Sequence, residues 1–288
     1  LVSIRLWVGV MRKCRWLLLL VFFLFVGCGT KFAYNNISWF AVSYIEDFVS
    51  LSNSQESELE ARLDSLQAWH KETQLPLYIE QLQVLQNMRR SELNSAFIVE
   101  QSEQIKSHIR TIVNKFSPDI YALSMQLNPK QDREFLSNFR KKQQEFYEER
   151  LSLNDDDSRE RYRERIEERL ERWLGSVSKE QKQIIATWSQ EWINTNDNWR
   201  EYQNNIYQDL TLLMEKKSDL HISQSIIMKL LLDNESYYPD GLESQLNKNM
   251  QTSTKFLVNI AAVSSDKQWS YFINELESLE STLITLQE

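Results

Sequence analysis

A row of four arginines carries residue types and a spacing that suit anion binding. Its members recur every three or four residues, so a helix would present all of them on one face: Arg161, Arg165, Arg169 and Arg172. A guanidinium group holds a carboxylate or a phosphate through two parallel hydrogen bonds, so the row is a candidate anion-binding face. Three interspersed glutamates could instead pair with it and leave a solvated, salt-bridged surface: Glu164, Glu168 and Glu171.

The usual signatures of catalysis are absent from the sequence. It contains no G-x-S-x-G elbow, no glycine-rich phosphate loop and no H-E-x-x-H motif. The three histidines, His70, His108 and His221, lie far apart in the sequence. His70 comes near the end of an expected helix, where a cation suits the helix dipole, and this favours a structural role. We therefore predict no catalytic residue, no metal site and no cofactor.

Cys28 is the candidate for covalent chemistry. Three cations, Arg12, Lys13 and Arg15, precede an apolar run over 16–26, as in a secretory signal, and residues 1–10 lie ahead of the expected initiator Met11. The order L-F-V-G-C at 24–28 resembles a bacterial lipobox, in which the cysteine sulfur is acylated before the chain is cut. We expect cleavage between Gly27 and Cys28, with the lipid on Cys28. A plain signal peptide and a membrane anchor remain alternatives, although the run is about half the roughly 20 residues that span a bilayer.

Charge and cysteine content limit the partners. The chain has 41 acidic residues against 33 lysines and arginines, four of which lie in residues 1–27, so the mature chain has a formal net charge of −12. Nucleic acid is therefore not an expected partner, because affinity for a phosphate backbone needs clustered cations without offsetting acids. Cys14 and Cys28 are the two cysteines, so cleavage would leave no pair for a disulfide. A hydrophobic core must hold the mature chain together.

Apolar residues recur every three or four positions and glycine and proline are rare, which predicts an all-α protein, an elongated multi-helix bundle with long antiparallel helices. Residues 28–33 should be a lipidated tether, 34–154 a first helical half and 155–288 a second, with the seam near 154–157. Pro76, Pro118 and Pro129 should each lie in the first turn of a helix. The expected helices are 34–49, 53–73, 77–115, 118–126, 130–151, 157–174, 179–216, 223–233, 242–262 and 266–286.

A start signal recurs four times along the chain. Each copy has a serine or asparagine followed three residues later by glutamine, which is the pattern of a capping box. In such a box the first side chain accepts the third amide of the helix and the glutamine reaches back to the cap. The four pairs are Ser52 with Gln55, Asn128 with Gln131, Ser178 with Gln181, and Ser265 with Gln268. The pattern also resembles the L-T-x-x-Q motif of Spy-like periplasmic chaperones, which implies binding of unfolded clients.

A broader resemblance covers most of the mature chain. Y-N-N at 34–36, W-H at 69–70, L-P-L-Y at 75–78 and R-W-L-G at 172–175 resemble a family of Gram-negative lipoproteins known only as a domain of unknown function. This resemblance implies an outer-membrane lipoprotein with a helical domain facing the periplasm, and it carries over no catalytic residue. The sequence does not indicate the oligomeric state.

We therefore expect a non-enzymatic binding or scaffold protein, with a chaperone as its more specific form. Its partners would be the membrane, through the lipid, and an envelope protein or unfolded clients. The alternative is a lytic enzyme that acts on peptidoglycan, because a single general-acid glutamate in a helical domain could support that chemistry.

Overall fold

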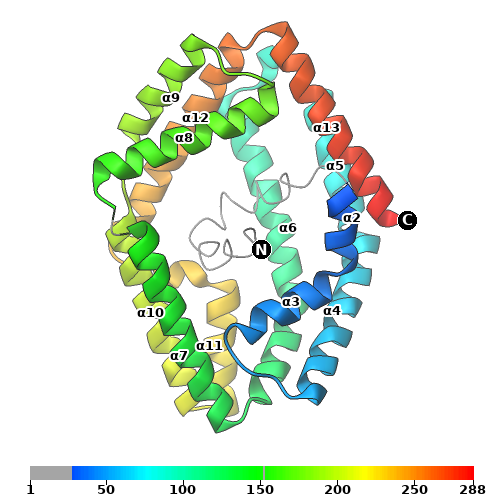
Figure 1. Cartoon of the computed structure of the whole chain (residues 1–288), viewed down its shortest axis with the longest axis vertical. Coiled ribbons are helices and arrows are strands. Elements are labelled where there is room, and N and C mark those ends of the chain that lie inside the picture. The colour runs from blue at the N-terminus through cyan, green and yellow to red at the C-terminus, as the bar shows by residue number, and fades with distance from the viewer. Residues whose placement is uncertain (1–27, 152) are drawn as a thin grey trace. The chain divides into compact units, whose positions relative to one another are not determined.

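The computed structural model describes residues 28–151 and 153–288 (Figure 1). Within these ranges the chain forms twelve α-helices, labelled α2 to α13, and no strand. The all-α prediction is therefore confirmed. The expected signal and its cleavage residue Gly27 lie outside the described residues. Residues 28–33, expected as a tether, belong to helix α2. No helix in 28–151 or 153–288 combines the length and the apolar character that crossing a bilayer requires.

The chain divides into two compact units that interleave along the sequence. Of the described residues, the first unit combines 28–74 with Lys106–Leu151 and Asp197–Pro239. The second combines Leu75–Ile105, Ser152–Asn196 and Asp240–Glu288. The expected division into 34–154 and 155–288 differs from this arrangement, although one unit boundary, after Leu151, lies next to the expected seam. The reason is that helices far apart in the sequence pair with each other, so each unit is built from separate segments of the chain.

The first unit is built around aromatic side chains. Phe48 lies with its ring centroid 6.1 Å from that of Phe135 and 6.3 Å from that of Phe139, and Phe139 stacks on Tyr207 at 6.4 Å. Its elements are α2 (Cys28–Asn35), α3 (Ile37–Glu46), α4 (Asn53–Thr73), the later part of α6 (Ser95–Met125), α7 (Pro129–Phe146), a π-helical turn (Tyr147–Leu151), α10 (Asn196–Glu215), α11 (Leu220–Leu232) and a 3-10 turn (Asn234–Tyr237).

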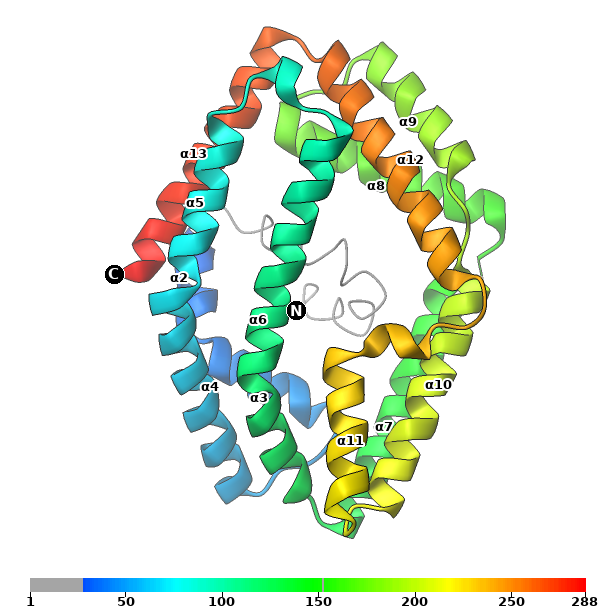
Figure 2. The same cartoon turned by 180° about the vertical axis from the view of Figure 1, so that it is seen from behind.

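The second unit packs its helices in pairs. Helix α13 lies along α5 (Figure 2), and α9 contacts both α8 and α12. One cluster of its buried residues consists of Leu174, Ile185, Trp188, Phe256 and Ile260. The elements are α5 (Leu75–Gln86), a 3-10 turn (Arg90–Glu92), the first part of α6, α8 (Asp155–Leu174), α9 (Lys179–Glu191), α12 (Leu242–Val263) and α13 (Asp266–Gln287).

Two of the expected long helices are interrupted. The helix expected over 77–115 is broken by the turn at Arg90–Glu92, where the Glu92 carboxylate accepts the Arg89 amide at 2.9 Å. The helix expected over 179–216 stops at Glu191, and α10 begins at Asn196. At each break, polar side chains form hydrogen bonds with backbone groups that no longer have a partner in the helix. The apolar pattern of the sequence can therefore continue through the break.

The helix expected over 34–49 is also divided, at Asn36, into α2 and α3. A further difference concerns Pro118, which was expected to begin a helix of its own over 118–126. It instead lies inside α6, which continues to Met125. Proline removes one backbone hydrogen bond from a helix, so it usually ends one. The hydroxyl of the buried Ser117 donates to the Val113 carbonyl at 2.6 Å. By contrast, Pro129 lies in the first turn of α7, as expected.

Candidate functional site

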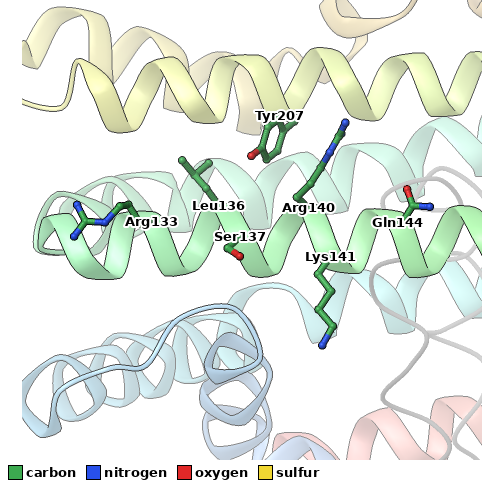
Figure 3. Close-up of a pocket in the computed structure, with 7 residues that line it drawn as sticks. All are labelled: Arg133, Leu136, Ser137, Arg140, Lys141, Gln144 and Tyr207. Atoms are coloured by element: carbon green, nitrogen blue, oxygen red, sulfur yellow. The ribbon is translucent and has the colours of Figure 1, made fainter.

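An open groove on the first unit is the candidate site. It has a volume of about 560 Å³ and runs along α7 beside α10 (Figure 3). The α7 side chains that line it recur at helical spacing, and one side chain from α10 faces them. The lining residues are Arg133, Leu136, Ser137, Arg140, Lys141, Gln144 and Tyr207. Three of these are cations and none is acidic, which distinguishes the groove in a chain whose acidic residues outnumber its basic ones.

Arg140 is the most firmly positioned of the three cations. Its Nη1 donates to Oδ1 of Asn204 at 2.7 Å and to Oε1 of Gln143 at 3.2 Å. The centre of its guanidinium lies 4.9 Å from the centroid of the Tyr207 ring, a cation–π contact. Figure 3 shows Arg140 and Tyr207 on the side of α7 that faces α10, whereas Lys141 points away from α10.

The two helices that form the groove are fixed to each other by polar contacts. Nε2 of the buried Gln143 donates to the Gln203 carbonyl on α10 at 2.8 Å. At the start of α7, Lys217 pairs with Asp132 at 2.6 Å and also donates to the Leu127 carbonyl at 2.7 Å. Both side chains of this ion pair are largely buried, with exposed fractions of 15% and 11%. These contacts hold α7 beside α10 and beside the turn that follows it.

Such a groove can hold an anionic group. Arg133 and Lys141 are exposed and carry positive charge on either side of Arg140 along the helix. A guanidinium that is already oriented loses less side-chain entropy when it binds a carboxylate or phosphate. The Lys141 ammonium has an acidic neighbour, Glu145, at 4.0 Å, and both side chains are at least half exposed, so this pairing is weak.

The arginine row singled out from the sequence lies elsewhere, on α8 in the second unit. All four side chains, Arg161, Arg165, Arg169 and Arg172, are half-buried. Burial lowers the pKa of Arg169, and the nearby Glu168 opposes this effect. On the same helix, Arg163 pairs with Glu160 and Glu167 pairs with Lys182. Anion binding by the row stays a prediction, whereas the groove on α7 did not stand out in the sequence.

The four glutamine motifs are capping boxes, and they occur in pairs. In each box the cap side chain accepts the third amide and the glutamine accepts the amide of the cap. In the first unit, Nε2 of Gln131 donates to Oε1 of Gln55 at 2.7 Å and to the Ser50 carbonyl at 2.9 Å. In the second unit, Nε2 of Gln268 donates to Oε1 of Gln181 at 2.8 Å and to the Ser176 carbonyl at 2.9 Å.

These bonds are equivalent in the two units. Ser50 stands two residues before the cap Ser52, and Ser176 stands two residues before the cap Ser178. Each unit therefore joins the N-termini of two helices that are distant in sequence through the same arrangement of glutamine amides. The recurring motif has a structural use in both units.

His70 has a structural contact, but without the positive charge at the helix end on which its expected role rested. Its Nδ1 is 3.0 Å from the hydroxyl of Tyr34, which comes from α2. Burial lowers the pKa of His70 to about 4 and raises the pKa of Tyr34 to about 12. At neutral pH both groups are therefore uncharged. Among residues 28–151 and 153–288, no three His, Cys, Asp or Glu side chains are grouped as a metal site would require.

Comparison with known proteins identifies a family without an assigned activity. No curated protein matches the chain, and no solved structure does. A family model matches residues 47–242, a range that includes the groove and three of the four capping boxes. Since this range covers more than half of the sequence, the chain belongs to the DUF6279 family, a family of unknown function.

Proposed function

We propose that the protein is an outer-membrane lipoprotein, anchored through Cys28, that presents a non-enzymatic binding or scaffold domain to the periplasm. The groove on α7 is the observation that carries the binding part, because it gathers Arg133, Arg140 and Lys141 without an acid among its lining residues. The anchoring part is supported by the lipobox-like order that ends at Cys28.

The groove favours an anionic partner of the cell envelope. Peptidoglycan offers carboxylates and lipopolysaccharide offers phosphates, and both are geometries that a guanidinium recognises. The groove is open and its cations lie along one helix. It therefore suits an extended partner better than a small substrate that a binding site would enclose.

Co-sedimentation of the full chain with purified peptidoglycan sacculi tests this proposal. The Arg133→Gln/Lys141→Gln variant should sediment less than the unaltered protein, and the difference should shrink in high salt because salt screens the attraction. Lys130→Gln/Lys248→Gln is the matched control, since it removes the same charge at two exposed positions outside the groove. Equal losses in both variants would show that net charge alone matters. A parallel assay with lipopolysaccharide separates a carboxylate partner from a phosphate partner.

The same samples address the enzymatic alternative. A peptidoglycan lytic enzyme would release soluble muropeptides during the incubation, whereas a binding domain leaves the sacculi intact. Released muropeptides would overturn the non-enzymatic proposal.

A chaperone-like activity is the more specific form of the proposal. Large apolar side chains are exposed on several helices, including Leu220 on α11 at 65%, and unfolded clients bind apolar surface. Light scattering from a reduced, unfolding client at near-stoichiometric ratios tests this form. Unchanged scattering would remove the chaperone and leave the scaffold.

A further inference from the structure

A contiguous group of aromatic side chains lies close behind Cys28. Phe32 on α2 is 63% exposed and Trp39 on α3 is 60% exposed. The ring of Phe40 joins them, with its centroid 6.5 Å from that of Phe32 and 4.8 Å from that of Trp39. We call Phe32, Trp39 and Phe40 the aromatic strip. Two large aromatic residues this exposed on neighbouring helices form a surface that water solvates poorly.

The segment around the strip is nearly free of charge. Between Cys28 and Glu46 the sequence has one charged residue, Lys31, in a chain of which 26% is charged. Ile37, at the start of α3, adds a further apolar side chain that is 43% exposed. Lys31 is exposed and stands next to Phe32. An apolar surface with a cation at its edge suits a lipid headgroup layer whose phosphates are anionic.

The opposite side of this segment is fixed to α4. The Ser38 hydroxyl donates to the Asp64 carboxylate, and the Gln67 amide donates to the Tyr34 carbonyl. Val42 on α3 is buried, with an exposed fraction of 4%. These contacts hold α2 and α3 in place, so the exposed aromatic residues cannot turn inward without breaking them.

The position of Cys28 identifies the occupant. Helix α2 begins at Cys28, and Phe32 is four residues further along it, an axial rise of about 6 Å. If Cys28 carries acyl chains inserted in a bilayer, this short rise keeps Phe32 close enough to reach the layer of roughly 5–10 Å in which interfacial helices lie. Tryptophan favours this same layer, because its ring is apolar and its N–H can bond to headgroups.

We propose that the aromatic strip lies in the headgroup layer of the periplasm-facing leaflet, so that α2 and α3 hold the first unit on the membrane surface in one orientation. This inference rests on the proposed lipidation of Cys28. It replaces a flexible tether with a two-part contact, in which the lipid supplies the anchor and the strip sets the orientation.

Quenching by brominated lipids tests the proposal. The lipidated full chain is reconstituted into vesicles of phosphatidylethanolamine and phosphatidylglycerol, with and without bromine on the acyl chains. Subtracting the emission of Trp39→Phe from that of the unaltered protein isolates Trp39. We expect this difference emission to be largely lost in the brominated vesicles. Trp199→Phe is the control, and the same subtraction isolates the emission of Trp199. Because Trp199 is 6% exposed, its emission should be equal in both vesicle types. Phe32→Ser should weaken the quenching of Trp39 while the protein still floats with the vesicles.

The outcomes separate the strip from the anchor. A chain that does not float with the vesicles would contradict lipidation, and with it both the proposed anchoring and the strip proposal. A chain that floats with Trp39 unquenched by bromine would overturn the strip proposal alone. If Trp39 were then also shielded from aqueous iodide, a second copy of the chain would be covering the strip.

Discussion

Gln268 donates a hydrogen bond from Nε2 to Oε1 of Gln181 over 2.8 Å, and each residue also closes the capping box of its own helix. A single primary amide thus satisfies backbone groups at one helix start and holds the start of another. Gln181 is fully buried and Gln268 is 7% exposed, so neither amide has water as a substitute. Helix caps are usually local devices, but here they join α9 to α13.

Gln181→Ala should therefore destabilise the fold more than removal of the cap alone. We expect Ser178→Ala to lower the free energy of unfolding by about 1 kcal/mol. Gln181→Ala also leaves the buried amide of Gln268 with only one of its two acceptors, the Ser176 carbonyl, so the loss should be about 2 kcal/mol. Urea unfolding followed by circular dichroism measures both. Gln183→Ala, an exposed position on the same helix, is the control and should change little. Equal losses for Ser178→Ala and Gln181→Ala would contradict the role given to the amide pair.

Lys217→Met should destabilise the first unit strongly. Removing this ammonium leaves the carboxylate of Asp132 buried without its cation, which costs about 3 kcal/mol. Adding Asp132→Leu should restore part of the loss, because an apolar pair replaces the uncompensated charge. Lys216→Met removes an exposed lysine at the neighbouring position and serves as the control. Chemical denaturation of the unaltered protein and the three variants measures the effect. A double variant with a lower free energy of unfolding than Lys217→Met would argue against the ion pair.

The protein should become less stable as the pH is lowered, because of His70. The pKa of His70 is lowered from 6.5 to about 4 in the folded chain, so below about pH 6.5 the unfolded chain takes up a proton that the folded chain does not. The stabilisation is thus fully present above pH 6.5 and is lost progressively down to about pH 4. Comparing the free energy of unfolding at pH 7 and pH 5 should show a smaller drop for His70→Gln than for the unaltered protein. His221→Gln, at an exposed position on α11, should keep the full drop.

Cys28→Ser should release the protein from the membrane. Serine has no thiol to acylate, so the variant should appear in the soluble fraction after a salt wash, whereas the unaltered chain should remain with the outer membrane. Several acyl chains hold a domain on a bilayer, while an aromatic surface alone binds it reversibly. Membrane fractionation with immunoblotting is the measurement. Retention of Cys28→Ser through the wash would count against lipidation.

Local signals in the sequence were enough to predict most of the helices. The helix expected over 53–73 has the bounds Asn53–Thr73, and the one expected over 266–286 is Asp266–Gln287. Both begin at a capping box, which marks a helix start within a few consecutive residues. The break at 87–94 combines the local bond between Arg89 and Glu92 with a distant one from Arg90 to the Ser264 carbonyl, and the break at 192–195 depends on distant groups. At the second break, Arg159 on α8 donates to the carbonyl of Ser189 at 2.6 Å and Asn249 on α12 accepts the Ile193 amide at 2.8 Å.

The candidate site was harder to predict for the same reason. Arg133 and Arg140 are seven residues apart, a spacing that puts both on one face of a helix, and this was the signal available. The residues that orient Arg140 come from α10, where Asn204 and Tyr207 are more than sixty positions away. The row on α8 stood out because its four arginines are close together in sequence, although burial in the fold is what determines their access to a ligand.

The interleaving of the two units determines when each can be completed during synthesis. Residues Leu75–Ile105 meet their packing partner α13 only after the last part of the chain has emerged. The first unit likewise waits for Asp197–Pro239. Long loops must close before these contacts form, so assembly is slow and comes late. A fragment cut at 154 would contain neither unit whole, and its unpaired helices would be targets for proteases.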